Sequence, residues 1–157
     1  MKRRTLYLAV LFGVSCVVQA AELSSFDEVR SQYQSYKDPT RVSYLYNRCA
    51  ALQLNVAAIF ARKGQSKAAQ DFESLAQHYM VLSEANEREI DKRRGLKSKD
   101  TMKTVQRNVA TVSEVYSKRL KANFAQRGDY VLGDAQLESE LNECVAVEVF
   151  VKKMVDR

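Results

Sequence analysis

The residues best suited to metal or nucleophilic chemistry are few in this chain. Its 157 residues include a single histidine, His78, and three cysteines, Cys16, Cys49 and Cys144. One histidine excludes centres built from several histidines, and the sequence contains no Cys-X-X-Cys-His segment, Gly-rich phosphate loop, nucleophile elbow or zinc-binding spacing. We therefore predict neither a metal nor a cofactor. We interpret His78 as a helix residue beside the core, with a haem held by His78 and a methionine as the alternative.

Carboxylates are plentiful and could supply acid/base chemistry. Two carboxylates that flank a scissile bond are the arrangement that glycosidases use. The same residues also suit the solvated faces of helices, and the sequence lacks the glycine-rich, aromatic segments that we associate with wall-cleaving enzymes. A carboxylate-dependent enzyme acting on envelope material is therefore an alternative function. The two groups are Glu84, Glu87, Glu89 and Asp91, and Glu138, Glu140, Glu143 and Glu148.

One of these carboxylates, Glu148, stands among alternating valines and needs a partner if it is buried. Arg48 is the only charged residue between positions 42 and 61, in a segment that is apolar on nearly all sides. A helix with this pattern is buried nearly all round. We therefore predict a buried ion pair between Arg48 and Glu148.

The most strongly charged stretch is basic. Eight basic and three acidic residues lie between positions 88 and 107, which gives a local net charge of +5. Such a surface attracts anionic partners, such as lipid headgroups, a cell-wall polymer or an acidic protein patch. Basic residues also suit the C-terminal end of a helix and the solvated surface, which is the alternative explanation. The predicted binding residues are Arg88, Lys92, Arg93, Arg94, Lys97, Lys99 and Lys103.

A group of tyrosines on both sides of the only proline, Pro39, is a second candidate surface. Exposed aromatic side chains are typical of protein interfaces. Burial under a short first helix explains the same residues, and the sequence does not choose between the two. The residues are Tyr33, Tyr36, Tyr44 and Tyr46.

The first twenty residues have the features of an export signal. Basic residues at positions 2–4 precede residues 6–18, which carry no charge, and Ala20 ends a run with small residues where a signal peptidase cleaves. We predict cleavage after Ala20 and a single mature domain, residues 21–157, that is periplasmic or secreted. An uncleaved anchor, although short for a ~30 Å hydrocarbon core, and lipidation at Cys16 are the alternatives.

Removal of this signal changes the charge of the domain. It takes away three basic residues and lowers the net charge from +6 to +3. The sequence pI of about 9.3 is thus partly a property of the signal, and nucleic-acid binding loses much of its support. We predict no transmembrane segment in the remaining chain, because its one long apolar stretch contains several polar residues that would be costly in a bilayer.

Two cysteines, Cys49 and Cys144, remain in the mature chain. An even number of cysteines in an oxidising compartment favours a disulfide bond. In the chain-entropy model, a link that closes a loop of roughly 95 residues stabilises the fold by about 4 to 5 kcal/mol. Two buried free thiols are the alternative.

The four glycines and one proline of the mature chain separate segments with helical spacing. In the second segment, apolar residues recur every three or four positions, which predicts a central helix. The valines at 145–151 alternate as in a strand, but no other segment offers a partner strand. We therefore predict an all-α domain. Its helices are expected over about 25–37, 40–62, 66–93, 99–127 and 134–155.

Helices that are joined by short loops tend to pack antiparallel to each other. We therefore predict an up-down-up-down four-helix bundle with an additional short N-terminal helix. In this arrangement Cys49 and Cys144 both lie roughly 14 to 15 Å from the same end of the bundle, which is consistent with one interhelical disulfide.

The sequence thus predicts an exported, non-enzymatic helical binding or accessory protein of the bacterial envelope. The basic stretch is the expected contact surface, and the partner is an unknown protein or an anionic envelope component. The alternatives are the carboxylate-dependent enzyme and a structural subunit that forms homo-oligomers through its central helix or its tyrosines.

Overall fold

The structure, a computed structural model, describes residues 23–36, 40–97 and 100–155, and the side chains of these residues except 33–36 and 146–155. The predicted export signal lies outside them. Five helices form the described part of the chain, and no strand occurs there. They are α1 (Phe26–Tyr36), α2 (Thr40–Arg62), α3 (Ser66–Arg93), α4 (Thr101–Arg127) and α5 (Ala135–Val155). The all-α prediction is confirmed, and residues 145–151 lie in helix α5 rather than in a strand.

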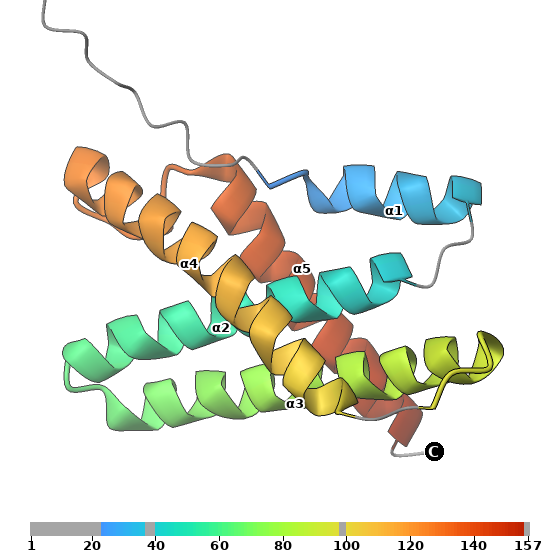
Figure 1. The fold of residues 1–157 in the computed structure, drawn as a ribbon. Helices are drawn as coiled ribbons and strands as arrows, with labels where there is room; N and C mark the ends of the chain where they lie inside the picture. The colour runs from blue at the N-terminus through green and yellow to red at the C-terminus, as the bar shows by residue number, and fades with distance from the viewer. Residues whose placement is uncertain (1–22, 37–39, 98–99, 156–157) are drawn as a thin grey trace, which may run out of the picture.

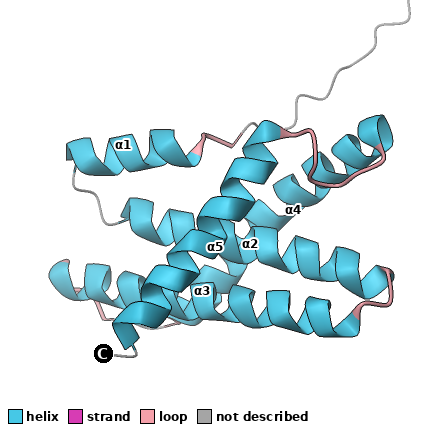
Figure 2. Cartoon of the chain, turned by 180° about the vertical axis from the view of Figure 1, so that it is seen from behind, coloured by secondary structure: helices cyan, strands magenta, loops and turns pink. Residues whose placement is uncertain are grey.

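The helices are arranged around α2, which contacts each of the other four. Helices α2 and α3 form an antiparallel hairpin (Figure 1). Helices α4 and α5 cross α2 obliquely on its two opposite sides, as the front and back views show (Figures 1 and 2), and α1 lies beside the first half of α2. Helix α2 is apolar on nearly all sides, and the other four helices cover it from several directions.

The up-down-up-down four-helix bundle is not confirmed. The α2–α3 hairpin is antiparallel as predicted, but α4 and α5 cross it at a steep angle instead of continuing its alignment (Figures 1 and 2). The physical reason lies in α2, because its apolar residues do not form a single seam facing one bundle axis. Small residues on α2, Ala50, Ala51 and Ala57, are fully buried and allow helices to approach it closely on more than one side.

The turn between α2 and α3 requires a glycine. Gly64 has φ +73°, in the left-handed region that residues with a Cβ rarely adopt. The amide of Gly64 donates to the Ala61 carbonyl at 3.0 Å, and the amide of Gln65 donates to the Phe60 carbonyl at 3.0 Å. These bonds satisfy the last carbonyls of α2 and reverse the chain, so that α3 packs along α2.

The predicted disulfide lies in the core between α2 and α5. The sulfur atoms of Cys49 and Cys144 are 2.05 Å apart and their Cα atoms 5.5 Å apart, as in a disulfide bond. Both cysteines are buried, together with Leu52, Tyr79 and Leu137. The hydroxyl of Tyr79 donates to the backbone carbonyl of Cys144, so α3 is tied to the same point.

None of the helices in the described ranges combines the length and the apolar character that crossing a membrane requires.

Candidate functional site

Of the predicted binding residues, Arg88, Lys92, Arg93, Arg94 and Lys97 lie at the end of α3 and in the turn after it, and Lys103 lies in the first turn of α4. We call these residues, together with Lys99, the basic tip. Helix α3 ends here in a Schellman motif around Gly95, which has φ +68°. The amide of Leu96 donates to the Asp91 carbonyl at 2.9 Å, and the amide of Gly95 donates to the Lys92 carbonyl at 3.1 Å. The backbone of the turn is therefore fixed, and the cationic side chains project from it. Lys99 lies outside the described residues.

Three cations of the basic tip are paired with neighbouring carboxylates. The distances are 2.7 Å for Arg88–Glu84, 3.0 Å for Arg93–Glu89 and 3.1 Å for Lys103–Asp100. A hydrogen bond from Arg88 lowers the pKa of Glu84, and a hydrogen bond from Arg93 lowers the pKa of Glu89. Both acids are thereby held in the charged form that pairs with these arginines.

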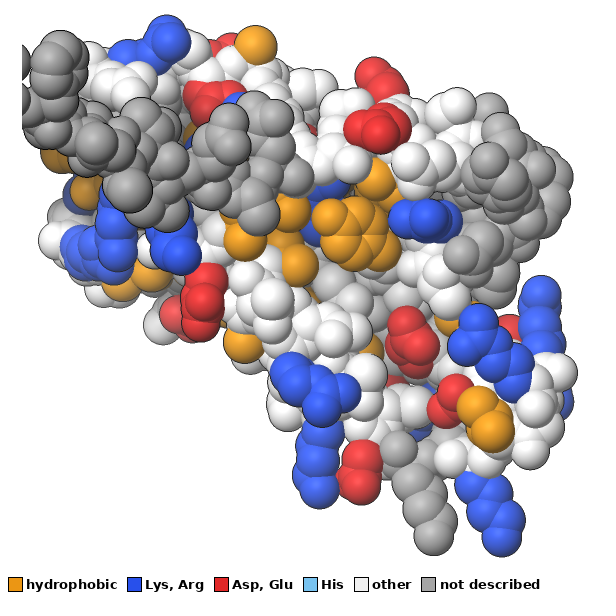
Figure 3. Space-filling view, turned by 45° about the horizontal axis from the view of Figure 1, so that its top comes forward, with side chains coloured by type: hydrophobic (Ala, Val, Ile, Leu, Met, Phe, Trp, Pro, Cys, Tyr) orange, Lys and Arg blue, Asp and Glu red, His pale blue; other side chains and the backbone are white. Residues whose placement is uncertain are grey.

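The remaining described cations of the basic tip face solvent. Lys92, Arg94 and Lys97 are exposed, and none of them forms an ion pair with any residue that the structure describes. Figure 3 shows several Lys and Arg side chains gathered at the lower right of the molecule, with acidic side chains between them. The exposed apolar residue of this turn is Leu96, whose relative exposure is 57%.

The tyrosines do not form one exposed patch as far as the structure describes them. Tyr44 and Tyr46 are half-buried. The guanidinium of Arg48 lies 5.5 Å from the ring centre of Tyr44, and the ring of Tyr46 lies 6.3 Å from that of Tyr79. Burial raises the pKa of the Tyr46 phenol. The side chains of residues 33–36 lie outside the described set, so the prediction for that half of the group stays a prediction.

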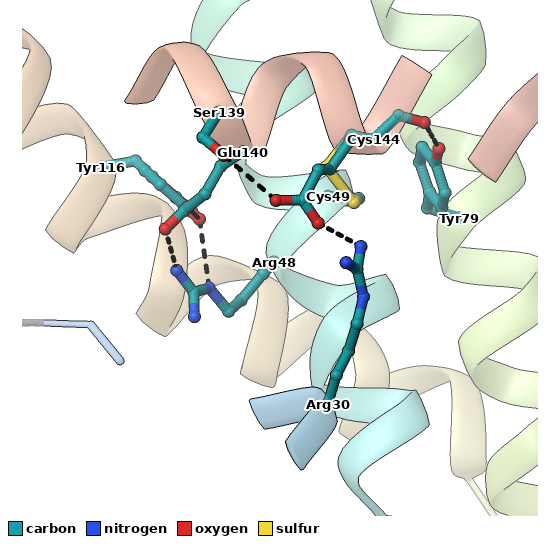
Figure 4. Close-up of a disulfide and its surroundings, with 9 residues drawn as sticks. Arg30, Arg48, Cys49, Tyr79, Tyr116, Ser139, Glu140 and Cys144 are labelled. Carbon is teal, nitrogen blue, oxygen red and sulfur yellow. Dashed lines mark hydrogen bonds and ion pairs between the residues drawn. A yellow bond between two sulfur atoms is a disulfide. The ribbon is translucent and has the colours of Figure 1, made fainter. Parts of the chain in front are cut away.

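A second polar cluster, which we call the buried junction, consists of Arg48, Tyr116 and Glu140. Arg48 has no exposed surface, and its Nη2 lies 2.5 Å from Oε1 of Glu140. Its Nε donates to the Tyr116 hydroxyl at 3.2 Å, and that hydroxyl donates to the other carboxylate oxygen of Glu140 (Figure 4). Three helices, α2, α4 and α5, are thus joined beside the disulfide. The predicted partner Glu148 has no described side chain, so its pairing stays a prediction.

The N-terminal segment is also fastened to the buried junction. Arg48 donates a hydrogen bond to the carbonyl of Ser24, and its guanidinium lies 4.6 Å from the ring centre of Phe26. A second ion pair joins Arg30 of α1 to Glu143 of α5, three residues after Glu140. The short helix α1 is therefore attached by charge as well as by apolar packing.

The electrostatics of the buried junction favour a fixed charge pair. Burial alone lowers the pKa of Arg48, but its interactions with Tyr116 and Glu140 outweigh burial and raise that pKa. Burial, followed by the negative charge of Glu140, raises the pKa of Tyr116 well above its ordinary value. The phenol therefore stays protonated and acts as a hydrogen-bond donor. Each of the three groups is engaged by the other two, which suits a structural fastening better than a reactive centre.

A hollow of about 410 Å³ lies beside the buried junction, between the end of α4 and the start of α5. Its single carboxylate, Asp134, is already held by Arg119, with both hydrogen bonds 2.7 Å long. The amide nitrogen of Asn123 donates to two loop carbonyls, each at 3.1 Å. The hollow therefore does not present the pair of converging carboxylates that the enzyme alternative requires.

The histidine is not part of a ligand cluster. His78 is half-buried next to Tyr79, and its Nε2 atom has no hydrogen-bond partner. Within residues 23–36, 40–97 and 100–155, no group of three or more His, Cys, Asp or Glu side chains is placed to hold a metal ion. Gln53 of α2 is fully buried, and its two amide atoms have no hydrogen-bond partner among the residues that the structure describes.

Two features of these clusters were missed by sequence reasoning. Glu140 belongs to the second carboxylate group, which was interpreted as solvated, but it is 2% exposed. Leu96 is not among the predicted binding residues, although its place directly after Gly95 at the end of a basic helix is a usable signal.

Comparisons of the chain with protein-family models, with curated proteins and with solved structures find no match.

Proposed function

We propose that this protein is an exported, non-enzymatic binding or accessory protein of the bacterial envelope, and that its basic tip contacts an anionic envelope component. One observation supports this proposal above the others. Lys92, Arg94 and Lys97 are exposed together at one end of the molecule and are not neutralised by ion pairs among the described residues.

Unpaired cations at one end of a molecule act on partners at a distance. Their fields add, which raises the local concentration of an anionic partner and the rate of encounter. The screening length is about 10 Å at 0.1 M salt, so binding that depends on these charges weakens as salt is added. By contrast, Arg88 and Arg93 each share their charge with a glutamate one helical turn away and contribute less to such a field.

Export is the second part of the proposal. The sequence pattern of residues 1–20 predicts a cleaved signal. The pair Cys49–Cys144 at bonding distance is compatible with an oxidising compartment, where disulfides form and persist. Mass spectrometry of the exported chain is expected to give an N-terminus at Ala21 and the loss of two hydrogens for the disulfide. A retained N-terminus, or two free thiols, would contradict export as proposed.

The decisive experiment compares two triple charge reversals on washed bacterial envelopes. The variant K92E/R94E/K97E reverses the exposed cations of the basic tip. The control R62E/K118E/K121E reverses three exposed cations elsewhere, at the end of α2 and on α4. Both variants change the net charge by the same amount, so any non-specific attraction falls equally.

We expect the wild-type mature chain to co-sediment with envelopes at low salt and to be released as salt rises. The basic-tip variant is expected to lose this retention, and the control variant is expected to keep most of it. Equal retention of the basic-tip variant and the wild type would remove the proposal. If both variants lost retention equally, net charge would explain the binding to envelopes. That result would also remove the basic tip as a site.

The enzyme alternative has no comparable support among the described residues. Four of its eight acids are engaged in ion pairs: Glu84 and Glu89 pair with arginines of the basic tip, Glu143 pairs with Arg30, and Glu140 pairs with Arg48 inside the buried junction. Self-association through α2 is also disfavoured, because the other helices cover α2.

A further inference from the structure

We infer that the partner of the basic tip is the anionic surface of a lipid bilayer, and that Leu96 enters the headgroup region while Lys92, Arg94 and Lys97 bind lipid phosphates. This inference rests on the proposed function and names its partner. It depends on an observation that charge alone does not explain: an apolar side chain with a relative exposure of 57% lies among these cations.

The exposure of Leu96 has a local cause. In a Schellman motif the residue after the glycine commonly packs its apolar side chain against the helix, on the residues three or four positions before the cap. Here the residue three before the cap is Asp91, which offers a charged group, and the next, Ile90, is 3% exposed within the core. Leu96 keeps the backbone bonds of the motif, and more than half of its surface remains exposed to solvent.

A bilayer surface satisfies both parts of the basic tip at once. Phosphate groups attract the cations, and the acyl boundary just below them accepts an apolar side chain. A wall polymer or an acidic peptide would pair with the cations and leave Leu96 in water. A protein interface needs on the order of 1,000 Å² of buried surface with an apolar centre. One leucine within a ring of charges does not provide such a centre.

The position of the basic tip in the fold also suits a broad, flat partner. The C-terminal end of α3, which leads into the turn at Gly95, lies at an end of the molecule (Figure 1). The acidic residues nearby weaken the field only in part. Glu89 and Asp100 are each paired with a cation of the basic tip, and Asp91 is half-buried.

The expected binding is weak and reversible. Each Lys or Arg near an anionic leaflet contributes about fivefold to partitioning, so the triple reversal is expected to weaken binding at least about 100-fold. Insertion of one leucine side chain contributes about tenfold. Both contributions exceed the error of a partitioning measurement. Removal of either one is therefore expected to weaken binding measurably.

The test uses the mature chain and vesicles of phosphatidylcholine with or without an equal amount of phosphatidylglycerol. Wild type is compared with L96S and K92E/R94E/K97E. The matched control is V81S. Val81 is an apolar residue of α3 that is 56% exposed and lies seven or more positions before the basic tip. Purified wall sacculi serve as the second anionic surface.

We expect binding only to vesicles that contain phosphatidylglycerol. L96S should bind about tenfold more weakly, and V81S should bind like wild type. Wild-type affinity of L96S would overturn the insertion of Leu96. Binding to sacculi without binding to vesicles would overturn the lipid partner while leaving the proposed function in place. Failure to bind vesicles, sacculi and washed envelopes would remove the inference and the proposed function together.

Discussion

The buried junction and the basic tip use the same residue type for opposite purposes. Arg48 of the buried junction has no exposed surface and is engaged by Tyr116, Glu140 and the Ser24 carbonyl. Arg94 of the basic tip is exposed and has no ion pair within the described part of the chain. The residues of the buried junction come from three helices, whereas those of the basic tip follow one another along the chain.

This contrast shows how surroundings decide what a charge contributes. A buried charge must be matched, and loss of its partner leaves a desolvated ion that is costly. An exposed charge is solvated, and its pairings are worth only about 0 to 1 kcal/mol. We therefore expect the buried junction to control stability and the basic tip to control binding. The following substitutions test this separation, beginning with the largest expected effect.

The largest effect is expected when the buried ion pair loses its acid. Glu140→Gln keeps the shape of the side chain but leaves the charge of Arg48 without a counter-charge. We expect a loss of about 3 to 5 kcal/mol in the free energy of unfolding, measured by urea denaturation. Glu143→Gln is the control on the same helix, because its partner Arg30 is 44% exposed and solvent can replace the contact.

The double variant R48M/E140L tests whether an unmatched charge or lost packing causes this loss of stability. It removes both charges, so no buried ion is left unmatched, and we expect it to be more stable than Glu140→Gln alone. A double variant that is as unstable as the sum of both single losses would show that packing, rather than charge, dominates at this position.

The helices and the disulfide were predictable because their signals are local or can be counted. Apolar spacing and glycine positions placed the five helices within a few residues, and an even number of cysteines left one pairing, Cys49–Cys144. The topology was not predictable in the same way. Spacing on α2 shows that it is buried but does not give the angle at which a partner crosses it.

The acid that pairs with Arg48 depends on that angle. In the structure Glu140, four residues before Cys144, pairs with Arg48 (Figure 4). The sequence predicts Glu148 as the partner, and because the side chain of Glu148 lies outside the described set, that pairing stays a prediction. The residues of the basic tip lie within sixteen positions of one another in the sequence, so their grouping depends less on how the helices cross. The exposure of Leu96 depends on side-chain packing, which apolar spacing alone does not give.

A smaller effect is expected at the start of α5. Arg119 holds Asp134, whose carboxylate also accepts the amides of Gln136 and Leu137 at 3.2 Å each. Burial alone raises the pKa of Asp134, but the hydrogen bond from Arg119 and these amides outweigh it and lower that pKa below its ordinary value of 3.8. The stabilisation is therefore complete above about pH 5 and is lost as pH falls through the lower pKa of the folded state.

Asp134→Asn is expected to cost about 1 kcal/mol near neutral pH, because it removes a partly exposed ion pair and weakens a helix cap. The difference from wild type should shrink as pH falls from 5 to 2. Urea midpoints across this range measure it, with Asp71→Asn, from an exposed pair with Lys67, as the control. A difference that stays constant down to pH 2 would show that the charge of Asp134 is not what stabilises the helix start.

The smallest effect on stability is expected at the basic tip. K92E/R94E/K97E places negative charge at the C-terminal end of α3, where the macrodipole disfavours it, and we expect a loss of no more than about 1 kcal/mol. Thermal and urea unfolding measure this loss. A decrease as large as that of Glu140→Gln would mean that the basic tip is a structural element, and it would undo the separation between the two regions.

The binding of the Glu140→Gln variant to envelopes tests the same separation from the other side. Glu140→Gln leaves every residue of the basic tip unchanged, and Arg48 lies on a different helix from all of them. At a temperature where this variant is still folded, its retention on washed envelopes should equal that of wild type. Because one region would then lose stability without binding and the other binding without stability, global unfolding could not explain both results.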